Sequence, residues 1–329
     1  MFHKLTIATL VSVLVLIFVG AIVRVTGAGM GCPDWPTCWG LLIPPTKVED
    51  VDFAKLEIKK FQAKAARMGR DPKSISHESL RAEFNPRHVW TEFINRLFSL
   101  PVGFFSVAAF VASFRLRNRR TLFISLSFIS LLLVLANAWM GARVVYSGIA
   151  PGVLSSHLAL AMALICVLTY SAWASADKHF YVTMRSQSGW LKGLILFLLI
   201  LVVAEGIMGT QVREITGEMA KAHLDLPKES WIHELEENWV YIVHRSFSWL
   251  LVVVTAIAFF LTRKHQATPL HFSQIGVVSI IAIQMLLGLI MAQVHIYSWV
   301  QVLHVGLAGI LLSLVFHWYL ILPSKRSSP

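Results

Sequence analysis

The chain has 329 residues, of which 56% are hydrophobic and 14% are charged, and its mean hydropathy is +0.65. A soluble domain carries fewer apolar and about 25% charged residues, so the composition excludes a water-soluble globule, a disordered chain and a disulfide-stapled mini-protein. The net charge of +11 does not predict nucleic-acid binding, because Lys and Arg in a membrane protein report topology.

Eight apolar runs are each long enough to cross a bilayer as a helix of about 20 residues. In chain order they are 5–24, 91–114, 121–144, 152–173, 190–211, 239–262, 272–294 and 299–322. The first run is long for a signal peptide and shows no clear cleavage site, so we expect it to be retained. The sequence therefore predicts an all-α polytopic membrane protein.

Basic residues are concentrated in alternate short loops. Four arginines lie in residues 115–120 and two basic residues at 263–264, whereas the loop after the seventh run has no Lys or Arg. The positive-inside rule then predicts that both termini are cytoplasmic, in a bacterial-type inner (cell) membrane.

The chain contains an internal repeat of four spans. Residues 137–161 align with 284–308 at a constant offset, which places His157 on His304. The run Asn-Arg-Leu-Phe-Ser beginning at Asn95 matches His-Arg-Ser-Phe-Ser beginning at His244, and Gly-x-x-x-Arg occurs near the ends of the first and fifth spans. Such repeats predict a duplicated unit. We therefore expect two pseudo-symmetric four-helix bundles with the same orientation, residues 1–175 and 176–329.

Three histidines, His157, His244 and His304, lie inside the outer ends of apolar runs. Polar groups there face the bundle interior, where they bond between helices or serve function. His244 and His304 lie on two helices at equal depth, a pattern that predicts a haem iron between two imidazoles. Arg245 would then pair with a haem propionate or extend to the interface. In the first half Asn95 breaks the pair, so either His157 alone ligates a haem or that half has lost its haem.

Two carboxylates lie in the predicted spans. Glu92 precedes Asn95 by three residues, so we expect both on one face of the helix, in its first turn. Glu92 either acts as an acid, a base or a charge stabiliser, or is placed where the helix dipole favours a negative charge. Glu205 has no partner that the sequence identifies, and we assign it no role.

Cys32 and Cys38 lie in the loop after the first span, on the predicted outer side. Oxidising conditions there permit a disulfide, which would be structural or would exchange with an outside redox partner. A polar insertion, 46–87, follows with ten basic and seven acidic residues. We interpret it as an extracytoplasmic helical hairpin or lid over the first bundle, with a flexible spacer as the alternative.

The motifs resemble those of the haem A synthase family. Residues 26–38, Thr-Gly-Ala-Gly-Met-Gly-Cys-Pro-Asp-Trp-Pro-Thr-Cys, are similar to its first-loop signature, and Glu-Phe-Ile-Asn-Arg at 92–96 resembles its Glu-x-x-His-Arg motif, with Asn95 in place of His. The resemblance implies oxidation of the methyl group at position 8 of haem O to a formyl group, which gives haem A for terminal oxidases.

The resemblance also implies roles for individual residues. It implies that His244 and His304 ligate the iron of haem b, with Arg245 beside them, and that His157 ligates the iron of the substrate haem, with Arg96 near it. It also implies that Glu92 is catalytic and that Cys32 and Cys38 form the family's cysteine pair. Asn95 puts a second histidine ligand for haem O in doubt, and His88, about 10 Å earlier along a helix, is a candidate replacement.

Partners and rival functions follow from the same features. We expect haem O synthase to donate the substrate and terminal oxidase assembly factors to be partners. We also expect a membrane electron donor, which the sequence does not identify, and no binding of nucleic acid. A di-haem membrane cytochrome b that only carries electrons would need the histidines but not Glu92. A transporter with duplicated halves would need no haem.

Overall fold

The computed structural model describes residues 1–67, 71–148, 152–178, 180–185, 189–223, 226, 228–294 and 296–323. Within these ranges the chain is almost entirely helical, and eight helices are long and apolar enough to cross a membrane. They are α1 (Phe2–Val25), α4 (Pro86–Ser113), α5 (Arg120–Tyr146), α6 (Val153–Ala174), α7 (Gly189–Ala222), α10 (Trp239–His265), α11 (Phe272–Gln293) and α12 (Ser298–Ile321). The eight predicted spans are confirmed, and the chain is a multi-pass membrane protein.

Two spanning helices, α4 and α7, extend furthest beyond the apolar runs that predicted them. The α4 helix begins at Pro86 because the Asn85 side chain accepts hydrogen bonds from the first-turn N–H groups and proline fits the first helical position. The α7 helix continues past the predicted end to Ala222. Its final segment is polar but rich in helix-forming residues, which a hydropathy criterion does not detect.

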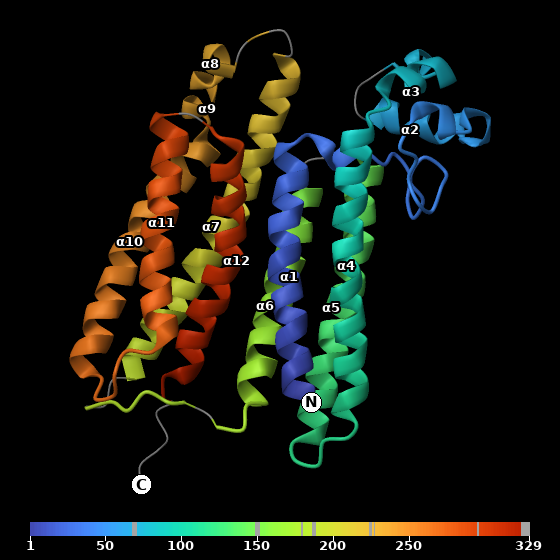
Figure 1. The fold of residues 1–329 in the computed structure, drawn as a ribbon. Coiled ribbons are helices and arrows are strands. Elements are labelled where there is room, and N and C mark those ends of the chain that lie inside the picture. The colour runs from blue at the N-terminus through green and yellow to red at the C-terminus, as the bar shows by residue number, and fades with distance from the viewer. Residues whose placement is uncertain are drawn as a thin grey trace.

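Each half of the chain forms a closed ring of four spanning helices. In the first half, α4 and α6 each contact both α1 and α5, and in the second half α10 and α12 each contact both α7 and α11. This matching order of neighbours is consistent with the predicted duplication. Figure 1 shows the rings side by side, with the start of α1 and the end of α12 at one end of the molecule.

The two rings meet through α12, which contacts α1 and α6. A Cβ atom at Gly306 of α12 would lie 2.1 Å from the Phe18 ring of α1, so glycine permits this close approach. Trp318 and Leu312 of α12 are fully buried in the main apolar core. The halves are therefore packed against each other along the central helices.

The polar insertion folds against the loop that carries the cysteines. It contains α2 (Ile58–Arg67) and α3 (His77–Glu83), which Figure 1 places at the end of the molecule opposite the start of α1. A small separate core includes Cys32, Cys38, Trp39, Val51, Leu56, Ile75, Leu80 and Val89. This core supports the helical interpretation over a flexible spacer, and residues 68–70 of the insertion lie outside the described ranges.

Candidate functional site

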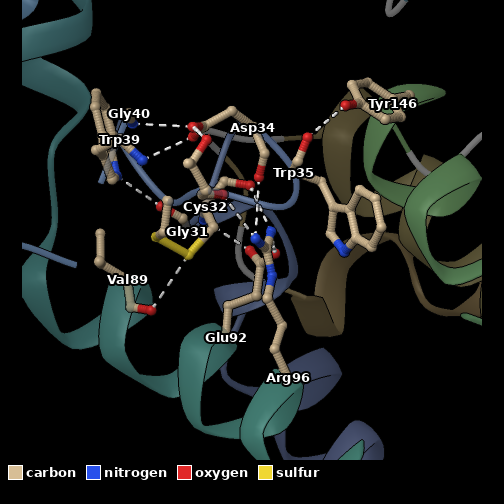
Figure 2. Close-up of polar contacts among 12 residues, drawn as sticks. Gly31, Cys32, Asp34, Trp35, Trp39, Gly40, Val89, Glu92, Arg96 and Tyr146 are labelled. Carbon is tan, nitrogen blue, oxygen red and sulfur yellow. Dashed lines mark hydrogen bonds and ion pairs between the residues drawn. A yellow bond between two sulfur atoms is a disulfide. The ribbon is translucent and has the colours of Figure 1, made fainter. Parts of the chain in front are cut away.

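The loop that carries Cys32 and Cys38 lies on the first turns of α4, as Figure 2 shows. In the structure the two sulfur atoms are bonded and the Cα atoms lie 4.7 Å apart. The Asp34 carboxylate organises the loop between them, because it accepts the backbone N–H groups of Trp39 at 2.7 Å and Gly40 at 2.9 Å. The loop is therefore closed by a covalent bond and by a carboxylate.

Gly31 allows this loop to touch the backbone of α4. A Cβ atom at Gly31 would lie 2.3 Å from the carbonyl oxygen of His88, a clash that glycine avoids. The Gly31 carbonyl also accepts the indole N–H of Trp39 at 2.8 Å. The Cys32 sulfur lies 3.7 Å from the carbonyl oxygen of Val89, and since a disulfide sulfur has no proton to donate, we treat this as a packing contact.

Glu92 lies directly beneath the cysteine loop. Its side chain is 5% exposed, with Oε2 accepting the Cys32 backbone N–H at 2.7 Å and Oε1 accepting Nη2 of Arg96 at 2.6 Å. The expectation that Glu92 lies in the first turn is wrong, because α4 begins at Pro86. A helix dipole acts mainly within the first turn, so it explains little of this placement.

Arg96 connects the same loop to Glu92. Its Nη1 donates to the carbonyl oxygens of Asp34 at 3.0 Å and Thr37 at 2.9 Å, and its Nη2 donates to that of Cys32 at 3.3 Å. The planar guanidinium suits several acceptors in one plane. Sequence reasoning assigned Arg96 to a haem and missed these contacts, because the loop and α4 are about 60 residues apart in the chain.

In the second half, His244 of α10 and His304 of α12 lie on diagonally placed helices of the ring. A Cβ atom at Gly209 of α7 would be 3.3 Å from Cε1 of His244, and one at Gly288 of α11 would be 3.9 Å from Cε1 of His304. Arg245, the residue after His244, is exposed, and its role stays a prediction.

The first half repeats this arrangement with one substitution. A Cβ atom at Gly20 of α1 would be 3.9 Å from Oδ1 of Asn95, and one at Gly141 of α5 would be 3.7 Å from Cε1 of His157. Asn95 therefore occupies the structural position that His244 occupies in the second half. Its Oδ1 is buried and has no hydrogen-bond partner in the described part of the chain.

Glu205 is a site residue that sequence reasoning left without a role. Its Oε1 lies 3.3 Å from Nδ1 of His244, without hydrogen-bond geometry, and the Ser248 hydroxyl donates to the same oxygen. Ser248 also lies 2.9 Å from the carbonyl oxygen of His244. Glu205 precedes Gly209 by four residues, so both lie on one face of α7. That spacing was the signal that could have placed Glu205 beside His244.

Four side chains occupy the positions that could ligate haem iron, here called the ligand positions: His244 and His304 in the second half, and Asn95 and His157 in the first. The two halves fit a haem to different degrees. Nδ1 of His157, His244 and His304 is buried without a hydrogen-bond partner among the described residues. Imidazole nitrogens are common axial ligands of haem iron, and the adjacent glycines leave space beside each ring. The second half therefore offers two imidazoles to an iron, whereas the first offers one imidazole and one neutral amide.

Comparison with known proteins identifies a family that the chain resembles along most of its length. Residues 3–316 match the COX15-CtaA family model, described as cytochrome oxidase assembly protein. Relatives named Heme A synthase include one from Shewanella oneidensis, 21% identical over 92% of this chain and 91% of the relative, and one from Wolbachia pipientis, 24% identical over 97% and 92%. Because the family model spans nearly the whole sequence, the chain belongs to the COX15-CtaA family of cytochrome oxidase assembly proteins.

Proposed function

We propose that the chain acts as a haem A synthase, a membrane oxidoreductase that converts the methyl group at position 8 of haem O to a formyl group. The observation that carries this proposal is the difference between matched positions: His244 and His304 in one half, Asn95 and His157 in the other. Two imidazoles suit a permanently held redox haem, whereas one imidazole and an open face suit a substrate that enters and leaves.

In the second half, His244 and His304 would hold haem b as its two axial ligands. This group supplies one-electron transfer between a membrane donor and the substrate site. Glu205, beside Nδ1 of His244, would fix the orientation of that ring and increase its basicity, as outer carboxylates do for metal-bound histidines.

In the first half, His157 would bind the iron of the substrate haem O on one side. Asn95 presents a neutral amide on the other side, and an amide is a poor ligand for haem iron. His88 lies in the first turn of α4, about two turns from Asn95, so we favour His157 as the single strong ligand. A single ligand lets the substrate bind and the product leave.

Glu92 is the group best placed to handle protons during the oxidation. It lies on the same face of α4 as Asn95, one turn nearer the cysteine loop, and is held by Arg96 and the Cys32 N–H. Converting a methyl to a formyl group is a four-electron oxidation, in which C–H bonds break, protons are released and the electrons pass to an external acceptor. A buried carboxylate there would accept a proton or stabilise positive charge. The matching residue of the second half is Tyr241, which supplies no carboxylate.

We further propose that the chain lies in a bacterial-type inner membrane with both termini cytoplasmic. This orientation puts the Cys32–Cys38 loop on the oxidising side, where its disulfide is stable and keeps the loop seated over Glu92. Haem O synthase would deliver the substrate in the membrane, and terminal oxidase assembly factors would receive the product.

Expression with haem O synthase in a host that lacks haem A tests the reaction. Mass measurement of extracted haem should reveal haem A, and the His157→Ala variant should leave haem O unmodified. Purified His244→Ala should lose the reduced haem b spectrum. A folded chain that yields only haem b, with haem O untouched, would instead identify an electron-carrying cytochrome b.

A further inference from the structure

Two arginines occupy matching positions near the ends of α1 and α7. Arg24 follows Gly20 by four residues, and Arg213 follows Gly209 by the same interval. Since residues four apart share a face of a helix, each arginine lies one turn beyond the glycine that packs against a ligand position. The duplication therefore places one guanidinium beside each half, toward the end that carries the cysteine loop.

These arginines meet where the two halves join. Nη2 of Arg213 donates to the backbone carbonyl of Arg24 at 3.4 Å, and Nη2 of Arg24 lies 3.1 Å from the position a Cβ would take at Gly217. Two side chains of like charge therefore lie at the same junction between α1 and α7. Nε of Arg24 is buried and has no hydrogen-bond partner in the described ranges.

The nearby acid does not complete this cluster. Glu214 follows Arg213 in the chain, and its oxygens accept hydrogen bonds from the backbone N–H groups of Gly152 at 3.1 Å and Ser155 at 3.3 Å, at the start of α6. The positive charges of two guanidinium groups are therefore balanced by the negative charge of one carboxylate. That carboxylate also accepts hydrogen bonds from the first N–H groups of α6. The cluster has two positive charges against one negative charge, and one buried donor, Nε of Arg24, lacks a partner among the described residues, which is the chemistry of an anion site.

A capping role explains part of the arrangement. The bond from Arg213 to the Arg24 carbonyl satisfies one acceptor in the last turn of α1, as basic residues often do there. It does not involve the side chain of Arg24, whose buried Nε has no hydrogen-bond partner among the described residues. Capping therefore does not explain why both of these partly buried arginines lie one turn beyond the ligand positions.

We propose that Arg24 and Arg213 bind carboxylates of the haems, Arg24 in the first half and Arg213 in the second. This inference rests on the proposed haem sites, and the propionates are the ionised groups that a haem offers. The other arginine near the first site, Arg96, is engaged by the cysteine loop, and Arg245 is exposed. Arg–carboxylate pairs are strong when partly desolvated.

Binding of ferric haem b and of its dimethyl ester tests this assignment. The full chain with His157→Ala, purified from haem-limited cells, is titrated with each ligand and read by the bis-imidazole spectrum of the second half. The parent chain should bind the free acid at least about tenfold more tightly than the ester, the difference expected for one charge-assisted bond. Arg213→Gln should lose this preference while its affinity for the ester stays within about twofold.

Two further variants make the result decisive. Arg143→Gln, which removes an exposed arginine in the last turn of α5, should keep the full preference. If Arg213→Gln does not fold, Arg213→Lys should keep a reduced preference. An unchanged preference in the Arg213 variants overturns the inference, as does equal binding of acid and ester by the parent chain. A folded parent chain that binds neither ligand overturns the haem site itself, and this inference with it.

Discussion

Replacing Glu92 with Gln separates the two roles that its position allows, anchor of the cysteine loop and acid or base in the oxidation. The amide keeps the size of the side chain, and its oxygen can still accept the Cys32 N–H. It loses the negative charge that Arg96 contacts at 2.6 Å. Proton transfer and charge stabilisation are lost completely, whereas anchoring is lost only in part.

The stability cost of Glu92→Gln follows from the same contacts. Losing a buried hydrogen bond to a charged group costs about 1.5–3 kcal/mol. We expect Glu92→Gln to lower the free energy of unfolding by about 2 kcal/mol. The loss stays below that caused by a buried charge with no partner, because Arg96 keeps its hydrogen bonds to the loop carbonyls. For a chain of this size the unfolding temperature in detergent should fall by about 4 °C.

A matched control perturbs the loop without touching the carboxylate. Asp34→Asn removes the charge that the N–H groups of Trp39 and Gly40 contact, and it should cost a similar amount. With equal haem loading, Glu92→Gln should reduce the ratio of haem A to haem O more than about tenfold, whereas Asp34→Asn should leave that ratio close to the parent value. If both variants lose haem A only in proportion to lost stability, Glu92 is an anchor and its assignment to the chemistry is refuted.

Three other changes test separate parts of the structure. Gly31→Ala should destabilise the chain by about 3 kcal/mol, because its Cβ would meet the His88 carbonyl, and an unaltered thermal unfolding curve would contradict that clash. Asn95→His should convert the ferric haem of the first half to a low-spin, two-imidazole spectrum, and an unchanged spectrum would show that position 95 does not face the iron. Glu205→Gln should raise the midpoint potential of haem b by on the order of 60 mV, a tenfold change in a one-electron equilibrium, so an unshifted redox titration would remove Glu205 from the site.

The spans could be predicted from sequence because a bilayer imposes a length on apolar helices that few other structures share. Their ends could not, since they depend on local contacts. Asn85 and Pro86 start α4 before its apolar run, and the polar end of α7 continues as a helix outside the apolar run. The error at α4 had a consequence for the site, because it moved Glu92 out of the first turn.

Within the site, sequence spacing predicted what lies along one helix or at matched positions of the repeat. His304 and His157 were recognised in this way, and so was the substitution of His by Asn95. Contacts between distant segments were missed: Arg96 with the cysteine loop, and Glu205 with His244. Their side chains meet only after the helices pack, and no local pattern reports which helices become neighbours.

The duplication gives a physical way to separate binding from chemistry. Features present in both halves, such as the glycines beside the ligand positions and the paired Arg24 and Arg213, would serve the role that we propose for both halves, which is holding a haem. Features present in one half account for what differs. The second half has Glu205 where the first has Leu16, so only its histidine lies beside a carboxylate. The first half instead has Glu92 and the Cys32–Cys38 loop. The differences between the proposed substrate site and the proposed redox site therefore lie within one turn of the ligand positions or directly above them.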